Sequence, residues 1–200
     1  MIAWTTTPNK TSTKVLTKKT GTWQDFIKSI RDTGQYTQKS TLPLLKMAEM
    51  GNTLNSKKSL RHEGNIQRVT GVIGDYDSEV LPVAQAIELL EKSGIKAYVY
   101  TSAGNTPEKP RWRVVCPLSK PHSPDAHTAL TARLNGALGG ILAGESFTLG
   151  QFYFFGKVTG VAFEDALTFD DAGEGGFIDT LDELDTLAIF KDGSRTPTAT

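Results

Sequence analysis

The segment Val69-Thr-Gly-Val-Ile-Gly-Asp-Tyr-Asp-Ser78 decides how this chain is expected to fold. Val72 and Ile73 are strong strand formers in a short run bounded by polar residues, so the segment is predicted to be a buried strand. Successive side chains of a strand point to opposite faces, and Asp75 and Asp77 therefore share one face at its end. Two such carboxylates repel each other unless a cation lies between them, and Mg²⁺ is a common partner that also carries phosphates. The alternative is a strand that runs into a turn with both carboxylates in water.

The composition limits the classes of protein to which the chain can belong. With 200 residues and 38% apolar content, it is long enough for one sizeable domain with a buried core. No run of about 18 apolar residues occurs, so no membrane span is predicted, and the N-terminus lacks the apolar core of a signal peptide. A single cysteine, Cys116, excludes a disulfide framework and a multi-cysteine zinc site. We therefore expect a cytoplasmic protein with no membrane partner.

The formal net charge is zero, but the charges are distributed unevenly. Residues 1–68 contain 12 Lys and Arg against 4 Asp and Glu, whereas residues 164–200 contain 2 basic and 10 acidic residues. A basic N-terminal part suits contact with a polyanion, and an acidic tail suits shielding of that part or a solvated linker. The basic cluster just before the decisive strand consists of Lys57, Lys58, Arg61 and His62. It is either a solvated loop or a contact with a nucleic-acid backbone or a nucleotide.

Hydrophobic periodicity predicts the elements on either side of this strand. Residues 1–20 are predicted to be a mobile basic arm, and residues 23–32 a helix capped by Thr22. After the strand, the pattern predicts in turn a helix, two strands, a helix and an aromatic strand, over residues 82–94, 95–101, 111–118, 123–138 and 151–156. This β-α-β-β-α-β order is the split unit of ferredoxin-like folds, so we expect an α+β fold.

The last part of the chain is predicted to be less regular. Residues 158–163 are expected to pair with the aromatic strand as a hairpin, and residues 180–190 to form an acidic helix. We expect one domain over residues 21–190, followed by a linker or tail at 191–200.

Two arginines mark the strand predicted at residues 111–118. Arg111 and Arg113 share one face of it, while Trp112, Val114 and Cys116 share the other. The arginines either form a salt-bridged solvent face or clamp phosphate groups, which the planar guanidinium suits well.

Three stretches together resemble the archaeo-eukaryotic primase superfamily, specifically the primase-polymerase domains of phage and plasmid replication proteins. They are Gly74-Asp-Tyr-Asp77, Tyr100-Thr-Ser-Ala-Gly-Asn-Thr-Pro-Glu-Lys-Pro-Arg-Trp-Arg-Val-Val-Cys-Pro-Leu118 and Glu145-Ser-Phe-Thr-Leu-Gly-Gln-Phe-Tyr-Phe-Phe-Gly156. Their order and spacing match over about residues 22–165. The resemblance implies an RRM-like, ferredoxin-like palm with an N-terminal helical and basic accessory layer. It also implies primer synthesis and extension by template-directed nucleotidyl transfer in phage or plasmid DNA replication.

The resemblance also implies roles for individual residues. Asp75 and Asp77 match the first metal-binding motif and would hold Mg²⁺ or Mn²⁺, and Glu145 is the candidate for a third catalytic acid, with Ala143 as the alternative for that position. The nucleotide-binding candidates are Asn105, Arg111, Arg113 and Gln151, and those that hold a single-stranded DNA template are Lys57, Lys58, Arg61 and His62. An NTP or dNTP would be the substrate, and a helicase domain, C-terminal or in trans, the expected partner.

One departure from the family pattern leaves an alternative open. Asn105 stands where the family has a histidine near the nucleotide phosphates, and asparagine can donate a hydrogen bond but carries no charge. Gly150 stands where a serine is usual. The alternative is a weakened or inactive domain that binds single-stranded DNA for a helicase or an initiator.

A phosphatase of the haloacid dehalogenase type is a rival interpretation, because such enzymes also begin with a strand that ends in Asp-x-Asp. Asp170 and Asp171 could supply its last motif, but Glu79 stands where threonine or valine is usual. The aromatic strand at residues 151–156 has no role in that scheme.

A rolling-circle nuclease shares the palm topology but needs paired histidines. His62, His122 and His127 are too scattered in the sequence for a His-x-His motif.

Overall fold

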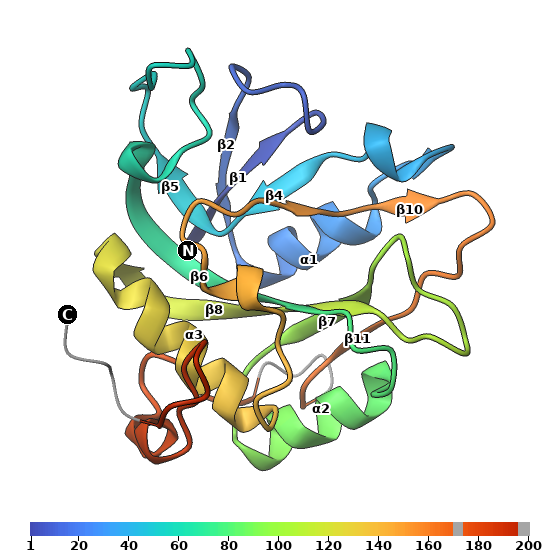
Figure 1. Ribbon diagram of the computed structural model, residues 1–200, viewed down its shortest axis with the longest axis vertical. Coiled ribbons are helices and arrows are strands. Elements are labelled where there is room, and N and C mark those ends of the chain that lie inside the picture. The colour runs from blue at the N-terminus through green and yellow to red at the C-terminus, as the bar shows by residue number, and fades with distance from the viewer. Residues whose placement is uncertain (170–173, 196–200) are drawn as a thin grey trace.

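The decisive strand lies inside a five-stranded antiparallel sheet. In a computed structural model that describes residues 1–169 and 174–195, it is β6 (Ile66–Tyr76), in a sheet ordered β11-β7-β8-β6-β5 (Figure 1). The neighbouring strands are β5 (Ala48–Met50), β7 (Tyr98–Thr101), β8 (Trp112–His122) and β11 (Asp165–Leu167). The mixed α and β composition agrees with the predicted class.

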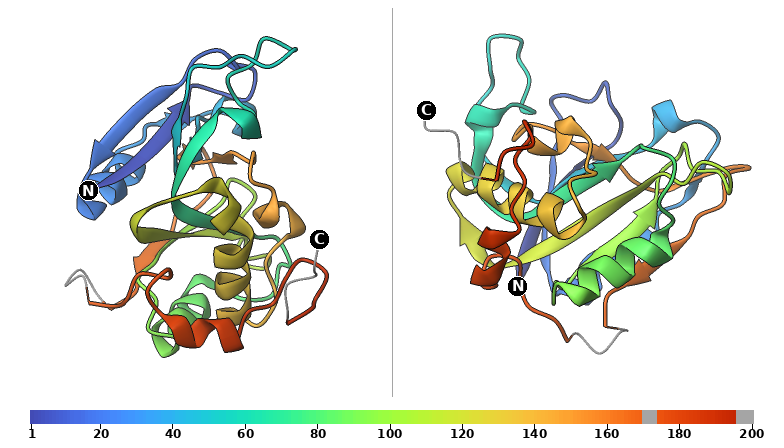
Figure 2. Two further views of the ribbon diagram at one scale, coloured as in Figure 1. Left: turned by 90° about the vertical axis from the view of Figure 1, so that its left-hand side faces the viewer. Right: turned by 60° about the horizontal axis from the view of Figure 1, so that its bottom comes forward.

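Both faces of this sheet are covered, because apolar residues alternate to both sides of its central strands. Val72 and Val114 pack on one side with α2 (Val83–Lys92) and α3 (His127–Ala137). Ile73 and Val115 pack on the other with α1 (Trp23–Arg31) and an N-terminal sheet. Figure 2 shows these two layers on opposite sides of the five-stranded sheet.

The strands and helices of the split unit are only partly arranged as predicted. β6, β7 and β8 lie in the order β7-β8-β6, and α2 and α3 connect to them in sequence. The predicted aromatic strand does not join them. Of that segment only β9 (Tyr153–Phe154) is a strand, and it pairs with β4 (Leu44–Lys46) in the N-terminal sheet, while β5 takes the place beside β6.

The prediction of a mobile arm at residues 1–20 is wrong. All six residues of β1 (Ile2–Thr7) are buried, and the strand lies between β2 (Thr17–Gly21) and β4 in a four-stranded sheet ordered β2-β1-β4-β9. Ile2, Ala3 and Trp4 supply apolar side chains, and the three threonines that follow are β-branched and fit a pleated surface, so the segment can be an inner strand.

Helix α1 begins and ends where its sequence predicts. The Thr22 side chain accepts a hydrogen bond from the Asp25 N–H, and the Asp25 carboxylate accepts one from the Thr22 N–H, which is a complete capping box. Phe26 and Ile30 are buried against the N-terminal sheet. The helix therefore packs on one face of that sheet.

The predicted hairpin after the aromatic strand is also wrong. β10 (Lys157–Val158) pairs in parallel with β3 (Gln35–Tyr36), far away in the sequence. The acidic segment forms a short 3-10 helix, Asp182–Thr186. It packs on α3, where a Cβ atom on Gly136 would lie 1.9 Å from the Leu187 carbonyl oxygen.

Cys116 is buried, and this burial raises the pKa of its thiol. Within residues 1–169 and 174–195, no helix has the length and apolar content to cross a bilayer. Asp170, Asp171 and residues 196–200 of the predicted tail lie outside the described residues.

Candidate metal and phosphate site

Three carboxylates meet at the end of β6. Asp75, Asp77 and Glu145 each offer one oxygen, and these oxygens lie within 4.8 Å of one another. Asp75 is buried, whereas Asp77 and Glu145 are exposed. The expectation that Asp75 and Asp77 project to one side of the strand agrees with this cluster.

Backbone hydrogen bonds bring Glu145 to β6. The N–H of Ala143 donates to the Asp75 carbonyl oxygen at 2.8 Å, and the N–H of Asp75 donates to Ser146 Oγ at 3.0 Å. The backbone N–H and the backbone carbonyl of Asp75 thus both hold the turn Gly144–Phe147 against β6. Tyr153 Oη, from β9, donates to the Glu145 carbonyl oxygen at 3.2 Å.

Asp75 is paired with an arginine on the neighbouring strand. Arg113 lies directly opposite it in the register of β6 and β8, with its Nε 2.7 Å from Asp75 Oδ1, and both side chains are almost fully buried. Arg113 Nη1 also donates to the Phe154 carbonyl oxygen at 2.9 Å. Burial raises the pKa of Asp75, and the charges of Asp77 and Glu145 raise it further, while Arg113 opposes them.

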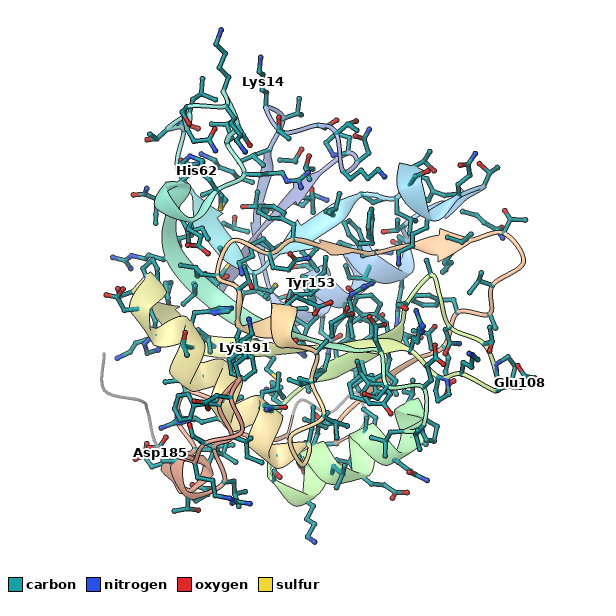
Figure 3. The ribbon with its side chains drawn as sticks, viewed as in Figure 1. Lys14, His62, Glu108, Tyr153, Asp185 and Lys191 are labelled. Atoms are coloured by element: carbon teal, nitrogen blue, oxygen red, sulfur yellow. The ribbon has the colours of Figure 1, made fainter. Side chains whose placement is uncertain are left out.

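The carboxylates open into a cleft of about 360 Å³ between the two layers. Four cations line it, namely Lys10, Lys39, Arg61 and Arg113. Its remaining walls come largely from the aromatic segment, including Gln151, Phe152, Tyr153 and Phe154. Figure 3 shows Tyr153 in the middle of the molecule, between the N-terminal layer and α3.

These residues fit a hard divalent cation. The cluster offers carboxylate oxygens alone, which are the donors that Mg²⁺ and Mn²⁺ prefer. Asp75 Oδ1 is buried, and although Arg113 Nε is close, the two atoms are not aligned as a hydrogen bond. Asp75 thus contributes to the cluster through a carboxylate that Arg113 also holds.

Arg111 does not line the cleft. Its Nε and Nη2 donate to Glu79 Oε1, and Lys109 Nζ lies 3.0 Å from Glu79 Oε2. Glu79 holds this position with a backbone φ of 63°, in the left-handed region that non-glycine residues seldom adopt. The hydrogen bond with Glu79 raises the pKa of Arg111, so its charge is already matched by a carboxylate.

The other two predicted nucleotide-binding residues differ in position. Asn105 Oδ1 accepts a hydrogen bond from the Arg111 N–H at 3.0 Å, so its side chain closes a loop and does not line the cleft. Gln151 does line the cleft, with its Nε2 donating to the Phe152 carbonyl oxygen at 3.0 Å.

Of the predicted template-binding residues, Arg61 alone reaches the cleft. Its guanidinium lies 5.4 Å from the centre of the Phe152 ring, and burial lowers its pKa. Lys57 and Lys58 are exposed on the preceding loop, and His62 Nε2 lies 2.9 Å from the Thr53 carbonyl oxygen.

Sequence reasoning missed Lys10 and Lys39. The one signal for them was the excess of Lys and Arg in residues 1–68, which predicts polyanion contact without saying which lysines make it. β1 and β4 bring both residues to the cleft through long-range pairing.

A larger cavity lies elsewhere. It measures about 590 Å³ and is lined by residues of α2, α3 and the segment 183–187. It does not contain the carboxylate cluster and is separate from the cleft described above.

Comparison with known proteins gives one distant likeness. No protein-family model matches the sequence, and no curated protein matches it. Among solved structures, the fold is similar to the archaeo-eukaryotic primase domain of the primase-polymerase of cyanophage S-2L. The two chains share 12% sequence identity and a TM-score of 0.49, over 92% of this chain and 88% of that chain. A likeness at this distance does not itself assign an activity.

Proposed function

We propose that this chain is a metal-dependent nucleotidyltransferase, which adds nucleotides from NTP or dNTP to a primer strand on a single-stranded DNA template. The observation that carries the proposal is the meeting of Asp75, Asp77 and Glu145 in one cleft with Lys10, Lys39 and Arg61, which have no carboxylate partner among the described residues. Acids alone would bind a cation, and bases alone would bind an anion. Both together suit a metal-bound polyphosphate.

Asp75, Asp77 and Glu145 would hold Mg²⁺ or Mn²⁺. When bound, such ions polarise phosphoryl oxygens and lower the pKa of an attacking hydroxyl. Arg113 holds the Asp75 carboxylate in place and offsets charge beside it. Lys10 and Lys39 face the same cleft and would bind phosphate oxygens that approach the carboxylates.

The test is primer extension with Mg²⁺ or Mn²⁺ on a primed single-stranded template. Glu145→Gln is expected to lower incorporation by more than the roughly 10- to 100-fold that changes outside the ligand shell cost. The matched control is Glu108→Gln, which removes an exposed carboxylate at the far edge of the molecule (Figure 3) and should leave the rate unchanged. Incorporation by wild-type protein in excess EDTA, or an unaffected Glu145→Gln variant, would contradict the proposal.

A second candidate is a domain that binds nucleotide and DNA without catalysis. The specific observation in its favour is that Asn105 and Arg111 are held by each other and by Glu79, away from the cleft. Nucleotide binding in the presence of Mn²⁺ without incorporation would select this candidate. Asn105→His should then restore measurable incorporation if the missing histidine is the cause. A helicase partner stays a prediction that nothing in the structure tests.

A further inference from the structure

Two loops of the N-terminal layer are joined into one basic surface, which we call the basic arch. It consists of residues 8–16, between β1 and β2, and residues 51–62, between β5 and β6. The Leu60 N–H donates to the Thr13 carbonyl oxygen at 2.8 Å, and Arg61 Nη1 donates to the Lys10 carbonyl oxygen at 2.9 Å. Both loops project from the same end of the molecule (Figure 1), where Figure 3 labels Lys14 and His62.

The arch carries charge of a single sign. It contains Lys10, Lys14, Lys57, Lys58 and Arg61 and no aspartate or glutamate. Among the described residues, no carboxylate pairs with any of these five side chains, whereas Arg133, Lys28 and Lys109 elsewhere do have acidic partners. A chain with zero net charge thus concentrates unpaired cations on one surface.

This surface is continuous with the carboxylate cleft. Lys10 and Arg61 belong to the arch and also line the cleft. Arg61 links the two loops by its hydrogen bond to the Lys10 carbonyl oxygen, and its guanidinium packs over the Phe152 ring. Its Nε is buried without a hydrogen-bond partner among the described residues. A cation desolvated in this way gains from an incoming anion, because no protein carboxylate already offsets its charge.

The arch also exposes two large apolar side chains. Val15 is 52% exposed and Leu54 is 51% exposed, one on each loop. Cations with exposed apolar side chains among them suit a ligand that has both phosphates and open bases. A single strand presents such bases, whereas a duplex stacks and pairs them inside.

We propose that a single-stranded nucleic acid lies along the basic arch, with its phosphates on Lys14, Lys57 and Lys58, and enters the carboxylate cleft beside Lys10 and Arg61. Five cations on two loops are more than the few negative charges of one triphosphate require, which favours a strand over a free nucleotide. That the strand serves as template rests on the proposed function, but its binding is measurable without any turnover.

The first test is fluorescence anisotropy with a short fluorescein-labelled oligo(dT). Lys57→Ala/Lys58→Ala is expected to bind roughly five- to tenfold more weakly than wild type at about 50 mM salt. The slope of log K against log salt should fall by about 1.4, because each phosphate contact on a single strand contributes about 0.7. The charge-matched control, Lys92→Ala/Lys96→Ala, removes the last residue of α2 and a lysine shortly after it, at the end of the molecule opposite the arch (Figure 1). It should bind like wild type, and equal weakening in both double variants, or in neither, would overturn the proposal.

The second test addresses the bases. Val15→Ser/Leu54→Ser is expected to weaken oligo(dT) binding about threefold and to leave binding of an abasic strand of equal length unchanged. A blunt duplex that binds wild-type protein as tightly as oligo(dT) would overturn the single-strand assignment. If wild type binds oligo(dT) through the arch but incorporates no nucleotide, the proposed function fails and the strand site stands.

Discussion

Asp75→Asn is expected to abolish nucleotide incorporation and, at the same time, to lower the stability of the fold. The loss of activity should reach about a thousandfold or more, because the charged oxygen that would bind the proposed metal becomes a neutral amide, and metal ions supply several kcal/mol of charge stabilisation. The loss of stability follows from Arg113, which is 5% exposed and would keep a buried charge without its partner. Removing one partner of a buried pair typically costs about 3–5 kcal/mol. We expect a smaller loss here, at most about 1 kcal/mol, because burial and repulsion from Asp77 and Glu145, which raise the pKa of Asp75, already disfavour the charged carboxylate that asparagine replaces.

The two effects can be separated with matched variants. Asp77→Asn removes an exposed carboxylate and should lose incorporation with little change in the free energy of unfolding, measured by urea denaturation. Asp75→Asn/Arg113→Met removes both buried charges and should be less destabilised than the sum of its single variants. An Asp75→Asn protein that is fully active, or a double variant with strictly additive losses, would contradict this account of the pair.

Lys46→Met is expected to stabilise the protein by about 3 kcal/mol at neutral pH. Lys46 is 4% exposed, and burial lowers its pKa from 10.5 to about 8, with Glu63 opposing the shift. The neighbouring His127 is also buried, and desolvation with the charge of Lys46 lowers its pKa to about 3. Lys46 therefore carries a charge in an unfavourable place, which methionine of similar length would not.

Because burial lowers the pKa of Lys46, the stabilisation by Lys46→Met is expected to depend on pH. Below pH 8 Lys46 is protonated in both the folded and unfolded states, so the penalty is fully present. Between pH 8 and 10.5 the unfolded chain binds more protons, so the wild type gains stability as pH rises, and the advantage of Lys46→Met shrinks. Urea unfolding at several pH values measures this difference, with Lys19→Met, an exposed lysine on β2, as the control that should change little. A difference that is independent of pH, or a destabilised Lys46→Met variant, would contradict the prediction.

Much of the fold could be predicted because its strongest signals are local. The capping box of Thr22 and Asp25 and the alternation along β6 and β8 each depend on residues close together in sequence. β1 could not be predicted in this way, since Ile2, Ala3 and Trp4 are followed by three threonines and a polar loop, and the strand is defined by its pairing with β2 and β4. The partner of β9 was missed for the same reason, because β4, which pairs with it, lies far away in the sequence, and β5 occupies the place beside β6.

The candidate site divides in a similar way. Asp75 and Asp77 could be placed on one face from the period of a strand alone, whereas Glu145 reaches them through hydrogen bonds that a sequence does not display. Arg111 was expected near the phosphates because it shares a face with Arg113. In the structure its guanidinium is hydrogen-bonded to Glu79 instead. Glu79 lies in a different loop from Arg111, and no periodicity in the sequence links these two residues.

The single buried cysteine has a practical consequence for studying strand movement. Cys116 is fully covered inside β8 and its thiol is held protonated, so it should resist maleimide dyes in the native protein. A cysteine placed at Lys57 would then be the one thiol open to labelling. A dye attached there, paired with one on the oligonucleotide, would report by energy transfer which end of a strand lies over the arch.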